Sequence, residues 1–492
     1  MKKIVLAAMT ALIILTGCRN QIPLSNQTLH LLVNGLSMEI PLGKNGAFFD
    51  VQTLNSEFPN TFELVNKLSG VSISVNGQRI EQNKPLEIAV NRIAYNENIE
   101  ITIRSKEDRR TMYIRALNSA IPTYTTAGIS PHEGHYYLTL LPVPVMLKLD
   151  KYGEIIYYLC PKNAKEMGVA DIETSTPAMS YWDFKKHVLS NGRVLYSYHE
   201  QNPYYNRLNL YGYAGGTRVI LDERYKEINR IILGANYAQS VNAVDGHDFY
   251  LIDENHYIVS NYELKLVYNI PASLDPHPQG SKVVTSHIQE VKNGEVLLDW
   301  YSTDYPELYA LSESDYNDFA NRTTQQPDYI HFNSVDIDTD GNLICSFRNI
   351  STILKIDRNS GDIMWKLSGN ADEFGLTDYQ KTSNQHYTRR TPDGYITIFD
   401  NNVRNQRSRV LKIMIDEEAK RVLEWKEFIV PGHFSVVCGS AVNLENDVFV
   451  IGWGFSVDGS AAFTEIDFAA NQKLFELTFS EGMNATYRAV KY

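Results

Sequence analysis

The chain has 492 residues, 43% of them hydrophobic and 21% charged, which is the balance of a globular protein and excludes a largely disordered one. The formal net charge of −12 leaves no basic surplus to neutralise phosphates, so we expect no nucleic-acid partner. The 31 tyrosines favour strands and aromatic-lined cavities.

Residues 1–18 have the pattern of a bacterial lipoprotein signal peptide. Lys2-Lys3 precede an apolar run from Ile4 to Leu15, which is too short to span a bilayer. The run ends in Leu15-Thr16-Gly17-Cys18, which is similar to the lipobox at which a signal peptidase cuts before a cysteine. We therefore expect a lipid on Cys18, a tether over residues 19–28, and a lipoprotein anchored to a bacterial membrane and facing the periplasm. An ordinary signal peptide with a chance cysteine is the alternative.

Three other cysteines, Cys160, Cys345 and Cys438, allow at most one intramolecular disulfide. None has the C-x-x-C spacing of a zinc site. Cys345 alternates into an expected strand, which indicates a small core residue. The sequence leaves open whether any two of the three form a bond.

Residues 29–121 are expected to form a small N-terminal β domain resembling a sandwich. Its short apolar runs lie between turns at Leu29–Val33, Val71–Val75, Leu86–Val90, Ile99–Ile103 and Thr111–Arg115. The segment Gln52–Leu68 is compatible with a short helix or an irregular edge. The domain has no cluster of reactive side chains, so we expect a structural role, in dimerisation or at the rim of a substrate site.

From residue 122 to 492, a turn flanked by strands recurs six times. The turns are Asn191-Gly192, Glu254-Asn255, Asn293-Gly294, Asp340-Gly341, Asp393-Gly394 and Asn446-Asp447. They fall 63, 39, 47, 53 and 53 residues apart. A repeat of about 50 residues with four strands is typical of propeller blades. The pattern predicts an all-β protein whose second domain is a six-bladed β-propeller.

One complete blade is expected between Tyr329 and Gly369. Residues 335–338 alternate apolar and polar, Asp340-Gly341 has the composition of a type I′ turn, and further strands are expected at 343–347, 352–356 and 363–367. Folding the first pair about its turn brings His331, Asn333 and Arg348 to the same end of the blade. We expect this end to be the functional one.

The first strand of each propeller blade lines the central channel, so equivalent positions should meet at one rim. Six to nine residues ahead of the six turns lie Asp183, His247, His287, His331, His386 and Ser440. His199 and Arg348 follow their turns and should return to the same face. A single histidine there would be explained as structural, but four at one repeat position favour a functional cluster.

This residue set favours an anion over a metal. No carboxylate partner of the histidines is evident from the sequence, and Arg348 would repel a cation. Imidazoles, the Asn333 amide and a guanidinium suit an anion with several oxygens. A neutral imidazole can also attack sulfur or phosphorus. We expect no metal and no dissociable cofactor.

These motifs resemble those of the bacterial arylsulfate sulfotransferases of the PAPS-independent type. The resemblance rests on His331 to Asp338, Ser346-Phe347-Arg348, Gln385-His386, Phe399-Asp400-Asn401 and Gly246-His247-Asp248. It covers nearly the whole mature chain and implies an N-terminal β domain before a six-bladed propeller. No short-loop disulfide of the kind found in some members is matched here.

The resemblance also implies roles for individual residues. His386 would take the sulfuryl group as a transient sulfohistidine, and His331 and Arg348 would hold the sulfate oxygens with a hydrogen bond from Asn333. His247 would be the acid toward the departing phenolate and the base toward the incoming phenol. His287 matches no catalytic position of the family, and lining the channel is the role expected of it.

The resulting hypothesis is a ping-pong transfer of sulfate from a phenolic sulfate ester to a phenol, by a homodimer formed through the N-terminal domain. One alternative is a non-catalytic lipoprotein propeller that binds an anionic ligand or glycan. Another is a quinone-dependent dehydrogenase propeller, but it would need metal-binding carboxylates that the sequence does not provide. The sequence does not specify the physiological donor or acceptor.

Overall fold

The computed structural model divides into two compact units, Met1–Ser119 and Ala120–Tyr492. The described residues are 27–33, 36–42, 45–46, 48–52, 60–90, 99–106, 108–117, 121–141, 145–159, 180–202, 212–233, 243–313, 316–323, 325–456, 461–480 and 485–492. The predictions for the signal peptide, for Cys18 and for Cys160 lie outside them. None of the helices in these ranges has the length and apolar character needed to cross a membrane.

The first unit contains two sheets that share one apolar core. The strands of the first sheet, in spatial order, are β2 (Leu36–Pro41), β1 (Thr28–Val33), β4 (Asn60–Val65) and β7 (Pro85–Val90). Those of the second are β3 (Phe48–Gln52), β9 (Arg109–Leu117), β8 (Ile99–Arg104), β5 (Ser72–Val75) and β6 (Gln78–Arg79). Alternate side chains of both sheets, such as Leu31, Phe62 and Ile101, meet in this core.

The prediction of a short helix or an edge at Gln52–Leu68 is wrong where the structure describes this segment. β4 pairs with β1 on one side and β7 on the other, so it is an inner strand. Phe62 and Leu64 alternate into the core and are fully buried. This period of two, which the surrounding polar residues obscure in the sequence, decides in favour of a strand.

The described part of the second unit forms six antiparallel sheets, which confirms the all-β prediction. Four follow one another along the chain: β14–β17 (Tyr181–Val188, Val194–Gln201, Gly216–Leu221, Glu227–Ile231), β18–β21 (Tyr250–Asp253, His256–Val267, Ser281–Lys292, Glu295–Tyr301), β22–β25 (Phe332–Ile337, Leu343–Phe347, Thr352–Ile356, Ile363–Leu367) and β26–β29 (His386–Arg390, Ile396–Asp400, Arg409–Asp416, Arg421–Phe428).

The two remaining sheets each join the beginning of the unit to its end. β10 (Tyr124–Gly128) pairs with β33 and completes the sheet of β30 (Ser440–Glu445), β31 (Val448–Gly452), β32 (Phe463–Asp467) and β33 (Gln472–Phe479). The last strand, β34 (Thr486–Lys491), pairs with β11 in the sheet of β11 (Tyr136–Leu140), β12 (Val145–Leu149) and β13 (Ile155–Leu159). The pairings of β10 with β33 and of β11 with β34 therefore close the ring of sheets.

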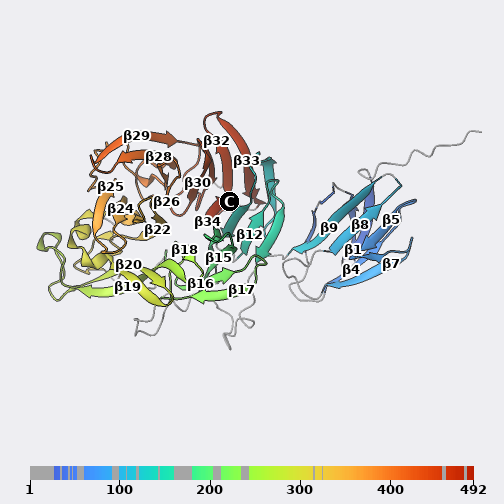
Figure 1. Ribbon diagram of the computed structural model, residues 1–492, viewed down its shortest axis with the longest axis horizontal. Helices are drawn as coiled ribbons and strands as arrows, with labels where there is room; N and C mark the ends of the chain where they lie inside the picture. The colour runs from blue at the N-terminus through green and yellow to red at the C-terminus, as the bar shows by residue number, and fades with distance from the viewer. Residues whose placement is uncertain are drawn as a thin grey trace, which may run out of the picture. The chain divides into compact units, whose positions relative to one another are not determined.

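The arrangement of this unit is β-propeller-like (Figure 1). The first strands β22, β26 and β30 lie against one another in turn, and β34 lies between β30 and β14. Apolar clusters join the neighbouring sheets; one includes Ile258 of β19 and Val335 of β22, and another Ile344 of β23 and Ile398 of β27. Short 3₁₀ helices lie in the connections, at Ala272–Leu274, Ser302–Asp304, Pro306–Leu311, Arg348–Ile350 and Val403–Asn405.

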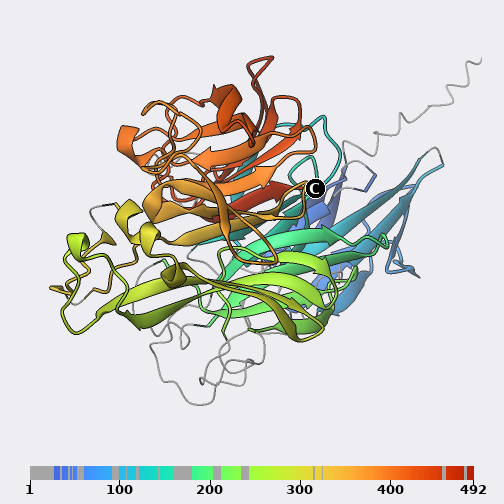
Figure 2. The same ribbon diagram turned by 60° about the vertical axis from the view of Figure 1, so that its left-hand side comes forward.

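The blade predicted between Tyr329 and Gly369 is confirmed as the sheet β22–β25, but one repeat was assigned wrongly. The turns at Glu254-Asn255 and Asn293-Gly294 belong to the same sheet, where they join β18 to β19 and β20 to β21. They are the two turns of shortest separation. β19 and β20, twelve residues each, form a long hairpin that projects from the unit (Figure 2). The sheet that the pattern missed is the one completed by β34.

Candidate active site

The histidines of the predicted rim lie at or just before the first strands of their sheets. His386 begins β26, His331 immediately precedes β22, and His247 lies three residues before β18. Arg348 follows β23, and its backbone N–H donates to the carbonyl of His331 (2.8 Å). β-Bulges interrupt the pairing at the start of β22 and β26. Bulges at such positions re-aim side chains, which turns these residues toward the rim.

His386 is held as a neutral imidazole with a defined tautomer. It is buried, and its Nδ1 lies 2.6 Å from Oδ1 of Asn401. The Asn401 amide is oriented by its Nδ2, which donates to the carbonyls of Ser435 and Cys438 (3.0 Å each). Nδ1 therefore carries the ring hydrogen and Nε2 has the lone pair, which accepts a weak bond from the N–H of Cys438 (3.3 Å).

The electrostatic surroundings also keep His386 uncharged. Burial, followed by the positive charge of Arg348, lowers the pKa of His386 well below its ordinary value. The charges of His247 and His331 act in the same direction. A ring that stays neutral at physiological pH has its Nε2 lone pair available for attack.

Arg348 has a guanidinium that the described residues satisfy only in part. Nη1 donates to the hydroxyl of Tyr316 (3.0 Å) and to Oδ1 of Asn349 (2.8 Å). Nη2 reaches the carbonyl of Val436 at 3.5 Å. Nε is buried and has no hydrogen-bond partner among the described residues. A buried arginine donor without an acceptor is a good position for an anion oxygen.

His247 and His331 face each other, with their Nε2 atoms 3.2 Å apart. The Nδ1 of His247 bonds to Asp245, and the Nδ1 of His331 bonds to Asp328. The expectation that the histidines have no carboxylate partner is therefore wrong. Each aspartate precedes its histidine by two or three residues, so local spacing was a usable signal. An aspartate at this spacing orients an imidazole ring through Nδ1 and need not be a metal ligand.

The structure separates His287 from this group. It lies on β20, the third strand of its sheet, where Nε2 is 2.6 Å from Oδ1 of Asp299 and the ring stacks on Tyr301 at 4.1 Å. Burial opposes its charge, but hydrogen bonds to Asp299 and Glu263 raise its pKa. The repeat position predicted for His287 followed from assigning its turn to a separate blade.

Asn333 contacts the site through the backbone. Its Nδ2 donates to the carbonyl of Gln385 (2.7 Å), the residue before His386. Gln385 in turn donates to Oγ of Ser346 and to the carbonyl of Phe347, at 3.1 Å each. These bonds tie the start of β26 to the sheet that carries His331 and Arg348.

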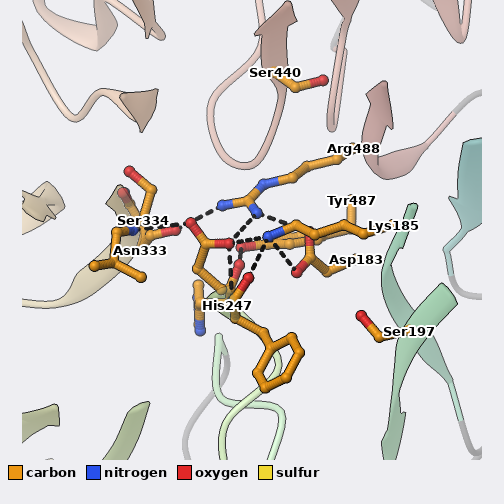
Figure 3. Close-up of polar contacts among 12 residues, drawn as sticks. Asp183, Lys185, Ser197, His247, Asn333, Ser334, Ser440, Tyr487 and Arg488 are labelled. Carbon is orange, nitrogen blue, oxygen red and sulfur yellow. Dashed lines mark hydrogen bonds and ion pairs between the residues drawn. The ribbon is translucent and has the colours of Figure 1, made fainter. Parts of the chain in front are cut away.

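A buried ion network lies next to His247, and the sequence patterns did not reveal it. Two carboxylates, Asp183 and Asp248, face four cationic side chains, at contacts of up to 3.1 Å: Lys185, Arg218, Arg389 and Arg488. Figure 3 shows Lys185 and Arg488 meeting Asp183, with His247 at the edge of the network. Burial opposes ionisation, but Arg389 and Arg488 hold the pKa of Asp248 well below its usual range.

Within this network, four cationic side chains face two carboxylates. Within the described ranges, no group of three or more His, Cys, Asp or Glu side chains is arranged to hold a metal ion. Cys345 and Cys438, the two cysteines that the structure describes, are free thiols and buried.

The family model for "Arylsulfotransferase (ASST)" matches residues 185–455, more than half of the chain. This chain belongs to the arylsulfotransferase family. The matched range contains His247, His331, Arg348 and His386, and it confirms the resemblance seen in the motifs. Membership indicates a sulfotransferase enzyme that acts on a sulfate donor and an acceptor.

Solved structures similar to this arylsulfotransferase are distant. A protein of unknown function from Bacteroides caccae is 11% identical over 73% of this chain and 99% of that chain, with a TM-score of 0.41. Virginiamycin B lyase from Staphylococcus aureus is 10% identical over 73% and 89%, with a TM-score of 0.31. A search of curated proteins found no match.

Proposed function

We propose that this protein transfers a sulfuryl group from a phenolic sulfate ester to a phenol, without PAPS, through a sulfohistidine on His386. The observation that carries the proposal is the neutral His386 ring with its lone pair on Nε2, beside an arginine whose Nε has no partner among the described residues. One short segment touches both groups, because Cys438 donates to Nε2 and the carbonyl of Val436 faces Arg348. The six sheets of the second unit would be the six blades of the propeller that holds this rim.

The chemistry divides into two steps. Arg348 binds sulfate oxygens of the donor, Nε2 of His386 attacks sulfur, and the bond from sulfur to the phenolic oxygen breaks. The phenolate takes a proton from His247 and leaves as phenol. The acceptor phenol then returns a proton to His247 and attacks sulfur, and the N–S electron pair goes back to Nε2. Charge on the outer and leaving oxygens of a loose transition state is the part that fixed donors stabilise.

Trp182 is the side chain that we assign to the aryl ring. It is partly exposed and packs with Cys438 and Tyr487, and its ring centroid lies 6.0 Å from that of His247. An apolar surface beside the proton donor would hold the phenyl ring with its oxygen toward His247.

The remaining parts of the hypothesis are proposals about residues or assemblies that the structure does not describe. Cys18 would carry a lipid that anchors the protein to the membrane, facing the periplasm. The two-sheet N-terminal unit would form the contact of a homodimer.

The test is to supply a chromogenic aryl sulfate with excess phenol and to follow release of the chromophore. Release by the wild-type protein and none by His386→Ala is the expected result. His187→Gln is a matched control, because His187 is a histidine of first strand β14 whose Nε2 bonds to Ser197 (2.7 Å). Mass spectrometry after quenching with donor alone should find one sulfuryl group on the peptide containing His386. Release without a label, or a label elsewhere, would reject the sulfohistidine. A folded protein that releases nothing would indicate the alternative, a non-catalytic anion-binding module.

A further inference from the structure

Four buried or nearly buried side chains form a hydrogen-bonded series that runs from Asp245 through His247 and His331 to Asp328. Asp245 bonds to Nδ1 of His247, the two histidine Nε2 atoms face each other at 3.2 Å, and Asp328 bonds to Nδ1 of His331. The ring planes are nearly perpendicular, at 87°, with centroids 4.9 Å apart. Asp245 is fixed further by the N–H groups of His247 (2.8 Å) and Ala214 (3.0 Å).

The partners determine how many protons this series can hold. An ionised carboxylate only accepts hydrogen bonds, so each Nδ1 must carry a hydrogen. If both rings were neutral, two lone pairs would face each other at 3.2 Å. If both were charged, two N–H groups and two cations would face each other. One proton between the Nε2 atoms is the arrangement that makes this contact a hydrogen bond.

We propose that His247 and His331 hold a single proton between their Nε2 atoms, that Asp245 and Asp328 keep it there, and that this proton is the one given to the departing phenolate and recovered from the acceptor phenol. The proposal rests on the proposed sulfuryl transfer and deepens it. His247 and His331 then form one acid–base unit, and the two aspartates are positioning residues.

The surroundings disfavour a full positive charge on His331. Burial lowers the pKa of His331, although Asp328 opposes this, and His247 and Arg348 lower it further. For Asp245, burial is outweighed by His247, and the pKa falls to about 2, so this carboxylate stays ionised. Three tyrosines also face the pair: Tyr262 and Tyr487 are in ring contact with His247, and Tyr213 is in ring contact with His331. Two further histidines interact with the series by charge. His199 interacts with Asp245, and His386 interacts with both His247 and His331.

The proton balance closes over the two half-reactions. In the first, the S–O bond breaks, the N–S bond to His386 forms, and the phenolate oxygen takes the shared proton, which leaves the pair neutral. In the second, the acceptor hydroxyl returns a proton to the pair as its oxygen attacks sulfur, and the N–S bond breaks. No oxidant, metal or other reactant is required.

The test compares donors whose leaving phenols differ in acidity. Asp245→Asn and Asp328→Asn should lower kcat/KM about 10²-fold for an ester of a weakly acidic phenol, which needs the proton. For 4-nitrophenyl sulfate, whose phenolate leaves without help, the loss should be within about threefold. A loss equal for all donors, or no loss, would overturn the proposal, because a structural defect does not depend on the leaving group.

The pH profile gives a second readout. Removing a carboxylate beside the pair lowers its affinity for the proton, so the alkaline limb of kcat/KM should move to lower pH by about one unit or more. Asp299→Asn is the matched control, because Asp299 bonds to His287 in the same way, outside the rim. It should leave both the limb and the dependence on donor unchanged, and the same shift in this control would overturn the assignment.

Proton counting by ¹⁵N NMR of labelled histidines separates this proposal from the proposed function. Spectra of His247→Gln and His331→Gln identify the two rings. Without substrate, the two Nε2 atoms should together carry one proton while both Nδ1 atoms stay protonated. Two protons on the Nε2 atoms, or none, would overturn the shared proton even if the enzyme transfers sulfate. One proton in a protein that releases no phenol would reject the proposed function and not the pair.

Discussion

His386 and the His247–His331 pair belong to one rim, and they differ in the group that faces Nδ1. His386 faces the neutral amide of Asn401, whereas the other two face the carboxylates of Asp245 and Asp328. A neutral acceptor fixes the tautomer without stabilising a charged ring. A carboxylate does both. The partner of Nδ1 therefore separates a histidine suited to attack from histidines suited to hold a proton.

Arg348 acts on both regions, since its charge lowers the pKa of His386 and of His331. Substitutions at these residues test whether the partner of Nδ1 separates the two roles, and the first is at Arg348, which acts on both regions.

Arg348→Ala should have the largest effect among these changes. It removes the donors for the sulfate oxygens and the charge that helps keep His386 neutral, so we expect kcat/KM to fall about 10²–10³-fold. Steady-state kinetics with a chromogenic aryl sulfate measures this. Arg348→Lys should recover part of the loss, because charge returns without the planar fork. Full activity in both variants would show that Arg348 does not bind the donor.

Asn401→Asp should convert the surroundings of His386 into those of His247. A carboxylate facing Nδ1 stabilises the charged ring and so raises the pKa of His386. At a pH below this pKa, each unit of increase lowers the fraction of neutral His386 about tenfold. We expect the acidic limb of the pH profile to move to higher pH, with activity recovering on the alkaline side. Asn401→Ala should lose activity at all pH values, since the ring and two carbonyls then lack their partner. An unchanged limb in Asn401→Asp would contradict this role.

Acid should destabilise the fold through buried or partly buried histidines that are neutral in the folded protein. Burial lowers the pKa of His386, and it lowers the pKa of His187 and His199 to about 3. Below about pH 6.5 the unfolded chain binds these protons and the folded one does not, so the free energy of unfolding falls by about 1.4 kcal/mol per pH unit for each. Urea denaturation at several pH values measures the slope, and His199→Gln should reduce it. An unchanged slope in His199→Gln would mean that His199 binds its proton equally well in the folded and the unfolded protein.

His287→Gln should have the smallest effect on catalysis. His287 lies on β20, and it bonds to Asp299 and stacks on Tyr301, both on the neighbouring strand β21. We expect kcat/KM of the folded variant to stay within about twofold of the wild-type value, because the partners Asp299 and Tyr301 belong to β21 and not to the proposed machinery. A tenfold loss of kcat/KM would indicate that His287 contributes to the substrate site.

Much of the fold could be predicted because its strands alternate and its turns are marked by Asn, Asp and Gly. The strands of β22–β25 follow from these local features, and they bring His331 and Arg348 together. The sixth sheet could not be predicted in this way, because β34 joins β11 from the opposite end of the chain. Arg488 of β34 was missed for the same reason, although its guanidinium bonds to both Asp183 and Asp248.

The sequence by itself determined the strand content and the family. It also determined that histidines precede the recurrent turns and that Arg348 follows one of them. These features depend only on residue type and spacing. Only the tertiary structure decided which ring nitrogen carries hydrogen and which predicted rim histidine, His287, lies apart from the others. It also decided which buried carboxylates pair with which cationic side chains. Those properties depend on burial and on partners such as Asn401, Asp245 and Arg488, which come from separate segments and meet only when the ring of sheets closes.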